Sequence, residues 1–254
     1  MNTLNIPTIA MILAAGLGKR MQPLTSTRPK PLIKVGGIAV IDRTLKHIGE
    51  AGISKAVVNV HYMADMMEEH LSNSKAPPEI IISDERESLL ETGGGITKAL
   101  PHLGNNPFFT INSDAIWQDG PENTFHKLAH GYVHEDEVHL LIIKTDLAYG
   151  YYGEGYTGKG DFFLKDDGQL EWRKGRDYAP YMFGGITLMS PKLFQDKKPE
   201  PFSSLEIFIK AQEAGKLFGH VHNGHWYHVG CPKAVGDIEV LLEQHGDDYI
   251  KGKR

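Results

Sequence analysis

The feature that most constrains this chain is an alternation, over its first 146 residues, of short β-rich runs with segments of helical period. Most of the runs are apolar throughout, as strands covered on both faces are. They occupy residues 9–14, 56–60, 79–83, 108–112 and 138–144, and helical periodicity appears at 40–50, 64–71 and 96–103. This alternation predicts an α/β fold with a mostly parallel sheet flanked by helices on both faces.

The residue composition of the sequence changes after residue 146. Glycine and tyrosine crowd residues 149–160, and residues 162–172 predict a β-hairpin around the turn at Asp166, Asp167 and Gly168. We interpret 147–181 as an insertion or lid within one domain spanning 1–254. Beyond it, the pattern predicts a strand returning to the sheet at 182–189, a helix at 204–214, extended chain at 217–229 and a last helix at 232–244.

Composition excludes several classes of function. The formal net charge is −5 and no Lys/Arg-rich run compensates it, so nucleic acid is not an expected substrate. Cys231 is the single cysteine, which rules out an intrachain disulfide and a cysteine-based zinc cluster and fits a reducing cytoplasm. No window approaches the roughly 20 apolar residues that span a bilayer, so we expect no membrane segment.

The most informative motif is LAAGLGKRMQPLTSTRPKPL at residues 13–32, which leaves the first predicted strand. A glycine loop at the carboxyl end of a strand lets backbone N–H groups approach phosphate oxygens. Arg20 follows this loop, and Lys30 lies ten residues further on between two prolines that restrict the backbone. We therefore predict that the two cations clamp a triphosphate, and that the nucleotide lies on Leu13, Ala14, Ala15, Gly16 and Gly18.

Other readings of this motif can be weighed on its residues. A dinucleotide-binding fingerprint needs a third small residue where Met21 stands, and the ATPase phosphate loop needs Ser or Thr where Arg20 stands. A purely structural turn would need neither Arg20 nor Lys30. The phosphate-binding interpretation is therefore the one that accounts for the whole motif.

The second candidate is the end of the predicted strand at 108–112, where Asn112, Ser113 and Asp114 follow one another. A carboxylate there faces the same sheet edge as the glycine loop, so Asp114 is a candidate ligand for Mg²⁺ that also touches the α-phosphate. Asn112 is assigned to the nucleotide site. The alternative is an aspartate that caps the next helix or turn.

These residues resemble the sugar-phosphate nucleotidyltransferase family, whose N-terminal motif has the form LAAGxGxRMxPLT followed by PKPL. Within it, the chain is most similar to the N-acetylmuramate 1-phosphate uridylyltransferases, through ETGGGI at 91–96, KALP at 98–101 and GDF at 160–162. The resemblance covers the whole chain. It implies a Rossmann-like sheet of the nucleotide-diphospho-sugar transferase type with a small inserted sugar-binding subdomain.

The resemblance also implies further site residues. In the family, the glycines corresponding to Gly93, Gly94 and Gly95 form a loop at the base, so Gly94 is assigned to nucleotide binding. Asp161 would accept hydrogen bonds from sugar hydroxyls, although a simple hairpin entry explains it about as well. Gly185 would leave room for a hexose.

One position departs from the family pattern. The second metal carboxylate normally appears in a motif of the form WxDVGT, whereas residues 226–231 read WYHVGC and place His228 where aspartate is expected. Magnesium prefers oxygen ligands, and imidazole suits Mn²⁺ or Zn²⁺ better. Three outcomes stay open: His228 ligates a site that tolerates Mn²⁺, or it contacts phosphate while Asp114 and the triphosphate hold Mg²⁺, or the second ligand is absent.

Together these features predict a cytoplasmic, Mg²⁺-dependent enzyme, with Mn²⁺ as an alternative ion, that joins a sugar 1-phosphate to a nucleoside triphosphate and releases pyrophosphate. UTP and N-acetylmuramate 1-phosphate, in cell-wall recycling, are the preferred pair. Mannose-1-phosphate guanylyltransferase, glucose-1-phosphate uridylyltransferase and a catalytically silent nucleotide-sugar-binding regulator are the alternatives. We expect a monomer or small homo-oligomer that binds neither nucleic acid nor membrane.

Overall fold

Four parallel strands form one half of the central sheet. The computed structural model describes residues 6–74, 78–150 and 158–247. Within them, the parallel strands are β1 (Ile9–Leu13), β4 (Lys55–Val60), β5 (Glu79–Asp84) and β6 (Phe108–Asn112). They lie in the order β6-β1-β4-β5, so the carboxyl ends of β1 and β6 are neighbours at one edge of the sheet. This is the edge at which open α/β sheets bind ligands.

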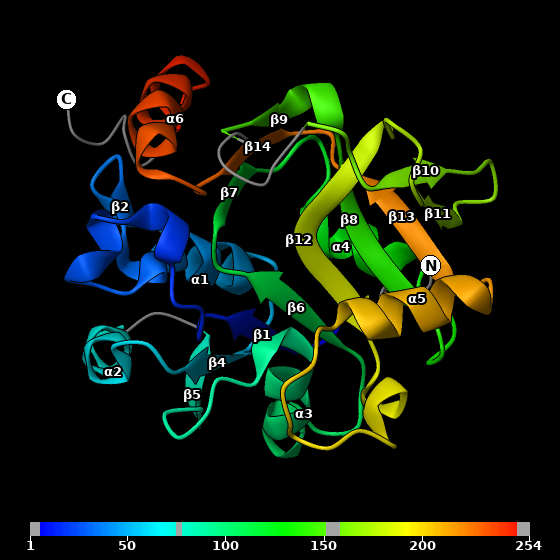
Figure 1. The fold of residues 1–254 in the computed structure, drawn as a ribbon, viewed down its shortest axis with the longest axis horizontal. Helices are drawn as coiled ribbons and strands as arrows, with labels where there is room; N and C mark the ends of the chain where they lie inside the picture. Colours follow the sequence, from blue (N-terminus) through cyan, green and yellow to red (C-terminus); the bar gives the residue numbers. More distant parts are fainter. Residues whose placement is uncertain (1–5, 75–77, 151–157, 248–254) are drawn as a thin grey trace.

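The other half of the sheet is largely antiparallel (Figure 1). Strand β12 (Tyr181–Met189) pairs antiparallel with β6 on one side and with β8 (Val138–Lys144) on the other. Strand β13 (Leu217–Val221) runs parallel to β8. The hairpin of β10 (Phe162–Leu164) and β11 (Leu170–Trp172) continues the sheet beyond β12. Together with the four parallel strands, these five strands form one mixed sheet of nine strands.

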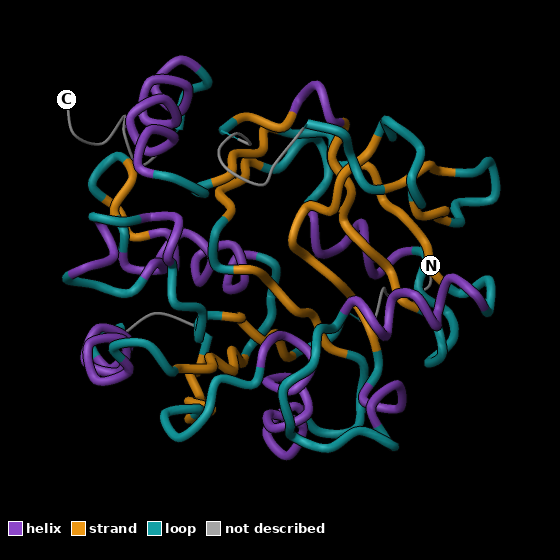
Figure 2. The backbone as a smooth tube through the Cα atoms, viewed as in Figure 1, coloured by secondary structure: helices purple, strands orange, loops and turns teal. Residues whose placement is uncertain are grey.

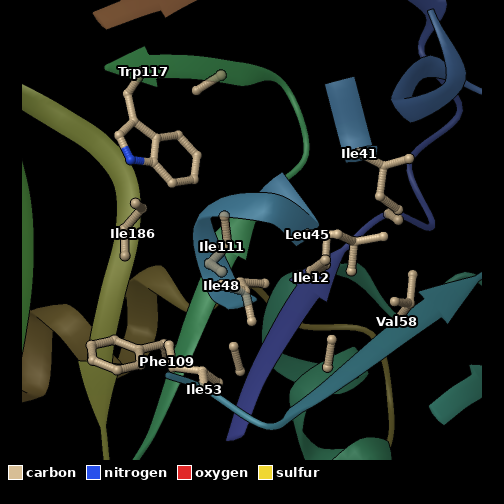
Figure 3. Packing of buried hydrophobic residues seen from close by; sticks show 14 of the residues in the cluster. Ile12, Ile41, Leu45, Ile48, Ile53, Val58, Phe109, Ile111, Trp117 and Ile186 are labelled. Carbon is tan, nitrogen blue, oxygen red and sulfur yellow. The ribbon is translucent and has the colours of Figure 1, made fainter. Parts of the chain in front are cut away.

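Helices cover both faces of this sheet because successive strand residues point to opposite sides. Ile12 and Val58 belong to the apolar cluster that includes α1 (Val40–Glu50), α2 (Ala64–Ser72) and α4 (Thr124–His130) (Figure 3). The opposite cluster holds their neighbours Met11 and Val57 with α3 (Glu91–Leu103) and α5 (Leu205–Glu213). In Figure 2 the strands run through the middle of the molecule and most helices lie around them.

A second, smaller sheet is built from β7 (Ala115–Gln118), β14 (His225–His228) and β9 (Ala148–Tyr149). A third apolar cluster joins it to α6 (Pro232–Gln244) through Ile116, Tyr227 and Ile238. Because β7 follows β6 directly and pairs with β14, the C-terminal part of the chain returns to the end of β6. The short hairpin of β2 (Lys34–Val35) and β3 (Ile38–Ala39) precedes α1.

The predicted fold class is confirmed, and most predicted elements lie within one residue of the observed ones. Three details of the prediction were wrong. Helix α3 begins at Glu91 and not at residue 96, the segment 217–229 forms two strands and not one, and β8 pairs antiparallel with β12. The predicted hairpin at 162–172 is present. The insertion or lid at 147–181 stays a prediction, and its residues 151–157 lie outside the described ones.

Among the described residues, no helix combines the length and the apolar character needed to cross a lipid bilayer.

Candidate active site

The glycine loop leaves the carboxyl end of β1 and forms one wall of a cavity of about 640 Å³. Its other walls come from the end of β6, from the start of α3 and from the segment that carries Lys30. The cavity is lined by Leu13, Ala14, Ala15, Gly16, Leu17, Gly18, Lys19, Arg20, Met21, Lys30, Pro31, Asn59, Leu89, Glu91, Thr92, Asn112, Ser113, Asp114 and Ser203. Every residue predicted from the motif at 13–32 therefore faces one cavity.

Two glycines of the loop have different reasons to be glycine. A Cβ atom at Gly16 would meet no described atom within 4 Å, so the backbone there is open to a ligand. Gly18 has a φ of +61°, and a Cβ there would lie 2.9 Å from Thr25 Cγ2 and 3.2 Å from Lys30 Cβ. Gly18 thus allows the segment with Lys30 to pack directly against the loop.

The predicted cation and carboxylate meet at the cavity wall. Lys30 Nζ lies 2.9 Å from Asp114 Oδ2, and His228 Nε2 lies 3.4 Å from the same oxygen. Burial alone would raise the pKa of Asp114, but the Lys30 ammonium and the His228 imidazole hold it well below its usual range. Asp114 is therefore ionised at neutral pH, and its side chain stays 26 % exposed toward the cavity.

Arg20 is exposed and lines the same cavity, and it forms no ion pair with any residue in the described ranges. Its guanidinium is therefore available to an anionic ligand. It lines both this cavity and the adjoining one described below.

Hydrogen bonds from polar side chains fix the backbone at the start of the glycine loop. Ser113 is nearly buried and its hydroxyl donates to Leu13 O at 2.7 Å, which ties the end of β6 to the end of β1. The Ala14 N–H donates to Asn59 Oδ1 at 2.7 Å. These bonds satisfy buried polar groups and hold the loop in one conformation.

A second cavity of about 340 Å³ adjoins the first on the antiparallel side of the sheet. Its walls are rich in aromatic rings, and they consist of Arg20, Thr92, Asn112, Asp114, Asp161, Phe162, Trp172, Phe183, Gly185, Ser203, Ser204, Leu205, Phe208, Trp226 and His228. Five of these residues, Arg20, Thr92, Asn112, Asp114 and Ser203, also line the larger cavity. The two cavities therefore meet beside Asp114.

The two predicted sugar-side residues both face this smaller cavity. Asp161 Oδ2 accepts the Phe183 N–H at 2.9 Å, and burial raises the pKa of Asp161. Gly185 has a φ of +83°, and a Cβ there would lie 3.2 Å from Asn112 Cβ. Gly185 sits in a β12 irregularity, so glycine there permits both the bend and the close approach of β6.

His228 reaches Asp114 through the small sheet. Antiparallel pairing of β14 with β7 sets His228 opposite Ala115, and Val229 N–H donates to Asp114 O at 2.8 Å. A Cβ at Gly230 would overlap the imidazole ring, so this glycine makes room for the ring. His228 is the residue at which the WYHVGC motif departs from the family pattern. The structure places it beside Asp114, the predicted metal ligand.

The interpretation of Gly93, Gly94 and Gly95 as a loop was wrong, because all three lie in the first turns of α3. Gly94 is buried and lines neither cavity. Its assignment to nucleotide binding stays a prediction, but its neighbours Glu91 and Thr92 are the α3 residues on the cavity wall.

Sequence reasoning missed Asn59 and the aromatic wall formed by Trp172, Phe183 and Phe208. Asn59 had a signal, since it is the polar residue inside the otherwise apolar end of β4. The aromatic residues had none, because an aromatic residue in a strand, such as Trp172 or Phe183, or on the apolar face of a helix, such as Phe208, is most often a core residue.

The side chains present fit a divalent cation that is held jointly with a phosphate ligand. Asp114 supplies a carboxylate and His228 an imidazole, and no group of three or more His, Cys, Asp or Glu in the described part of the chain is placed to hold a metal. A Mg²⁺ ion typically uses one or two carboxylates and takes its other ligands from substrate phosphates and water. This donor set matches that pattern with one carboxylate.

The chain is similar to known proteins over most of its length. Residues 9–157 match the family described as nucleotidyl transferase. The chain is 40% identical over 242 residues to the N-acetylmuramate alpha-1-phosphate uridylyltransferase of Caulobacter vibrioides, covering 94% of this chain and 98% of the relative. It is 31% identical to the enzyme of the same name from Neisseria meningitidis, covering 91% and 97%. Among solved structures, the inositol-1-phosphate CTP transferase from T. maritima has the same fold, with a TM-score of 0.73 at 20% identity over 96% of this chain and 98% of that one.

Proposed function

This chain belongs to the nucleotidyl transferase family, and we propose that it transfers a uridylyl group from UTP to N-acetylmuramate 1-phosphate in cell-wall recycling, giving UDP-N-acetylmuramate and pyrophosphate. The observation that carries the proposal is the junction of the two cavities at Arg20, Asn112 and Asp114. A nucleotide in the larger cavity and a sugar phosphate in the smaller one would meet there. A cytoplasmic location fits this reaction, because nucleoside triphosphates are available there. The single cysteine also fits a reducing compartment.

The reaction needs no nucleophile from the protein. An oxygen of the sugar phosphate attacks the α-phosphorus in line, the bond between the α-phosphorus and the bridging oxygen breaks, and pyrophosphate leaves with the electron pair. A phosphate monoester is largely ionised at neutral pH, so the residues of the site act by positioning and by stabilising charge. The backbone at Gly16 is open to the cavity, and Arg20 and Lys30 line it, so the loop would bind the triphosphate and the two cations would neutralise the charge that develops on it.

Asp114 and His228 would hold the metal ion together with the triphosphate. When bound, a divalent ion would neutralise phosphate charge and align the α-phosphate with the attacking oxygen. Lys30 has a separate effect, since its ammonium contacts Asp114 and keeps this carboxylate ionised. The Trp226 indole N–H donates to Gly184 O at 3.0 Å. This hydrogen bond fixes the indole ring in the wall of the smaller cavity.

The aromatic wall of the smaller cavity supports an amphipathic sugar. Phe183 and Trp172 present ring surfaces, on which the apolar face of a pyranose and the methyl groups of acetyl and lactyl substituents can pack. Asp161 supplies the acceptor on the same side. A hexose that lacks both substituents would leave more of this aromatic surface uncovered.

The test is pyrophosphate release from a matrix of UTP, GTP, CTP and ATP against N-acetylmuramate, mannose, glucose and N-acetylglucosamine 1-phosphates, with Mg²⁺ and Mn²⁺ in parallel. Release confined to UTP with N-acetylmuramate 1-phosphate supports the proposal. Release from GTP with mannose 1-phosphate, or from UTP with glucose 1-phosphate, would replace the substrates and keep the chemistry. Absence of release from every pair would favour a silent nucleotide-sugar-binding regulator.

The His228→Asp variant tests the metal site. An aspartate there supplies the oxygen ligand that Mg²⁺ prefers, so we expect the ratio of Mg²⁺- to Mn²⁺-supported turnover to rise by about tenfold. His228→Asn is the matched control, because it adds no charge. An unchanged ratio in His228→Asp would show that His228 does not ligate the ion.

A further inference from the structure

The first turn of α3 lies between the two cavities and contacts a different neighbour on each side. Gly93, Gly94 and Gly95 are all buried there. Gly93 and Gly94 face the segment 200–204, which precedes α5, and Gly95 faces the end of β4. Each contact is so close that a side chain would collide with its neighbour.

On the first side, the segment 200–204 is bound to the start of α3 by backbone hydrogen bonds. Phe202 O accepts the N–H groups of Gly93 at 2.8 Å and Gly94 at 3.3 Å, and Phe202 N–H donates to Leu90 O at 3.3 Å. The N–H groups at the start of a helix lack intrahelical partners. A remote segment therefore caps this helix, in place of a local side chain.

A Cβ at Gly93 would overlap the ring of Phe202, and a Cβ at Gly94 would overlap the backbone carbonyl oxygen of Glu200. The segment can reach α3 because these two positions have no side chain. Thr92 adds a further link, since its Oγ1 accepts the Ser204 N–H at 2.8 Å.

This attachment places Ser203 at the junction of the cavities. Ser203 is exposed and lines both of them. Its Oγ accepts the Leu205 N–H at 3.3 Å, which leaves the hydroxyl proton free to be donated to a ligand oxygen. Under the proposed function the ligand groups that meet at this junction would be phosphates, and a hydroxyl is a good donor to them.

On the other side, Gly95 admits a buried polar pair. A Cβ at Gly95 would lie 2.6 Å from Glu85 Oε1 and 2.9 Å from Asn59 Nδ2. Asn59 Nδ2 donates to Glu85 Oε1 at 2.7 Å, and the Oδ1 atom of the same amide accepts the Ala14 N–H. Glu85 Oε2 also accepts the Leu90 N–H at 3.2 Å, which anchors the pair to the N-terminus of α3.

We propose that the start of α3 is a two-sided positioning element: Gly93 and Gly94 seat the segment that brings Ser203 to the sugar phosphate, and Gly95 admits the Glu85–Asn59 pair that holds Ala14 in the nucleotide loop. The three consecutive glycines thus serve different substrates. This inference rests on the proposed function, in that it assigns the larger cavity to the nucleotide and the smaller one to the sugar phosphate.

The experiment compares Gly93→Ala, Gly94→Ala and Gly95→Ala, with KM measured separately for the nucleotide and the sugar 1-phosphate of the productive pair. We expect Gly93→Ala and Gly94→Ala to raise the sugar-phosphate KM about tenfold and the nucleotide KM less than about threefold. Gly95→Ala should show the opposite split. A direct nucleotide-binding role of Gly94, as the sequence predicts, would instead raise the nucleotide KM in Gly94→Ala. Equal changes of both KM values in all three variants, or no change, would overturn the proposal.

Rescue separates positioning from a general loss of folding. Phe202→Ala removes the ring that collides at position 93, so Gly93→Ala/Phe202→Ala should recover most of the lost sugar-phosphate affinity. The collision at position 94 involves backbone, which no side-chain truncation relieves, so Gly94→Ala/Phe202→Ala should not recover. Equal recovery of both double variants, or of neither, would contradict the proposed contacts.

Two further measurements complete the test. Ser203→Ala should raise the sugar-phosphate KM about three- to tenfold, and Ser72→Ala, an exposed serine on α2, should change neither KM. Calorimetric binding of UTP alone keeps the proposal testable if no pair releases pyrophosphate, which would refute the proposed function by itself. In that case Gly95→Ala should weaken UTP binding and Gly93→Ala should not, and the reverse would overturn the inference.

Discussion

The parallel and antiparallel halves of the molecule supply their ligand-facing residues in different ways. In the parallel half, most of the wall of the larger cavity comes from one stretch of chain, 13–21, and from the end of β6. In the antiparallel half, the smaller cavity draws one or two residues from each of β10, β11, β12, α5 and β14. Figure 1 shows how these elements are arranged. One half uses a continuous motif, and the other uses an assembly of distant residues.

The difference follows from strand direction. Carboxyl ends of parallel strands meet at one sheet edge, so a loop that leaves such a strand faces the ligand over several consecutive residues. In the antiparallel half, side chains alternate between faces, and each strand contributes isolated positions, such as Phe162 on β10 and Phe183 on β12. A motif can therefore identify the first kind of site from a sequence, whereas the second kind leaves scattered residues.

The largest expected effect tests the parallel half. Lys30→Ala removes the ammonium that contacts Asp114 and faces the larger cavity, so we expect kcat to fall about 100- to 1000-fold. Steady-state kinetics with the productive pair measure it. Lys34→Ala, an exposed lysine in β2, should leave kcat unchanged. Wild-type turnover in Lys30→Ala would show that Lys30 does not stabilise charge in the reaction.

A second prediction concerns stability in the antiparallel half, away from either cavity. His220 on β13 contacts His139 on β8, with 2.9 Å between His220 Nε2 and His139 Nδ1, and burial lowers the pKa of His220 from 6.5 to about 4. Between these values the unfolded chain binds a proton that the folded chain does not. Stability therefore falls as the pH drops from about 6.5 to about 4, by up to about 3 kcal/mol.

Urea unfolding of wild type and His220→Gln at pH 7.5, 6 and 5 measures this effect. The variant should lose less stability than wild type over this range, because glutamine does not titrate. His102→Gln, an exposed histidine on α3, should follow the wild type. Parallel pH profiles for wild type and His220→Gln would refute the assignment.

A third prediction sharpens the contrast between the cavities. Phe183 on β12 is half-buried in the wall of the smaller cavity, so Phe183→Ala should raise the sugar-phosphate KM about tenfold and leave the nucleotide KM nearly unchanged. Phe163→Ala is the matched control, since Phe163 lies outside the cavity lining and its ring packs under Arg176 at 4.0 Å. Comparable changes in both KM values would show that the two cavities do not bind the two substrates separately.

The smallest expected effect lies where the two halves meet. Glu91 starts α3 with a φ of +57°, a left-handed conformation that costs a non-glycine residue about 1–2 kcal/mol. Glu91→Gly removes this cost but adds freedom to the unfolded chain, so we expect a net gain of about 0.5 kcal/mol. Thermal unfolding checks it. Glu87→Gly, in the exposed turn before α3, should show no gain.

Local sequence patterns predicted much of the fold and much of the wall of the larger cavity. The bounds of α1, α6, β6 and β8 agree with the prediction, because hydrophobic periodicity is set by residues only a few positions apart. The joint assignment of Lys30 and Asp114 to one site, from residues 84 positions apart, is matched by their 2.9 Å contact. The catalytic and binding roles of these residues stay predictions until the variants are measured.

The three glycines at the start of α3 show where local patterns were insufficient. Three consecutive glycines favour a loop, since glycine is a poor helix former. In the structure all three are helical. Phe202, more than a hundred residues away, accepts the N–H groups of Gly93 and Gly94, and its ring packs where a side chain at position 93 would be. That stabilising contact exists in the folded chain alone.

The sequence by itself determined the α/β class, the glycine loop at 13–20 that lines the larger cavity and the departure at His228, because each depends on residue types at short and fixed spacings. Only the tertiary structure decided the 3.4 Å approach of His228 to Asp114, the aromatic wall around Phe183 and the seating of the segment 200–204 on α3. These features join strands and helices that are distant along the chain. Their contacts are set by side-chain packing across the sheet, which no local spacing specifies.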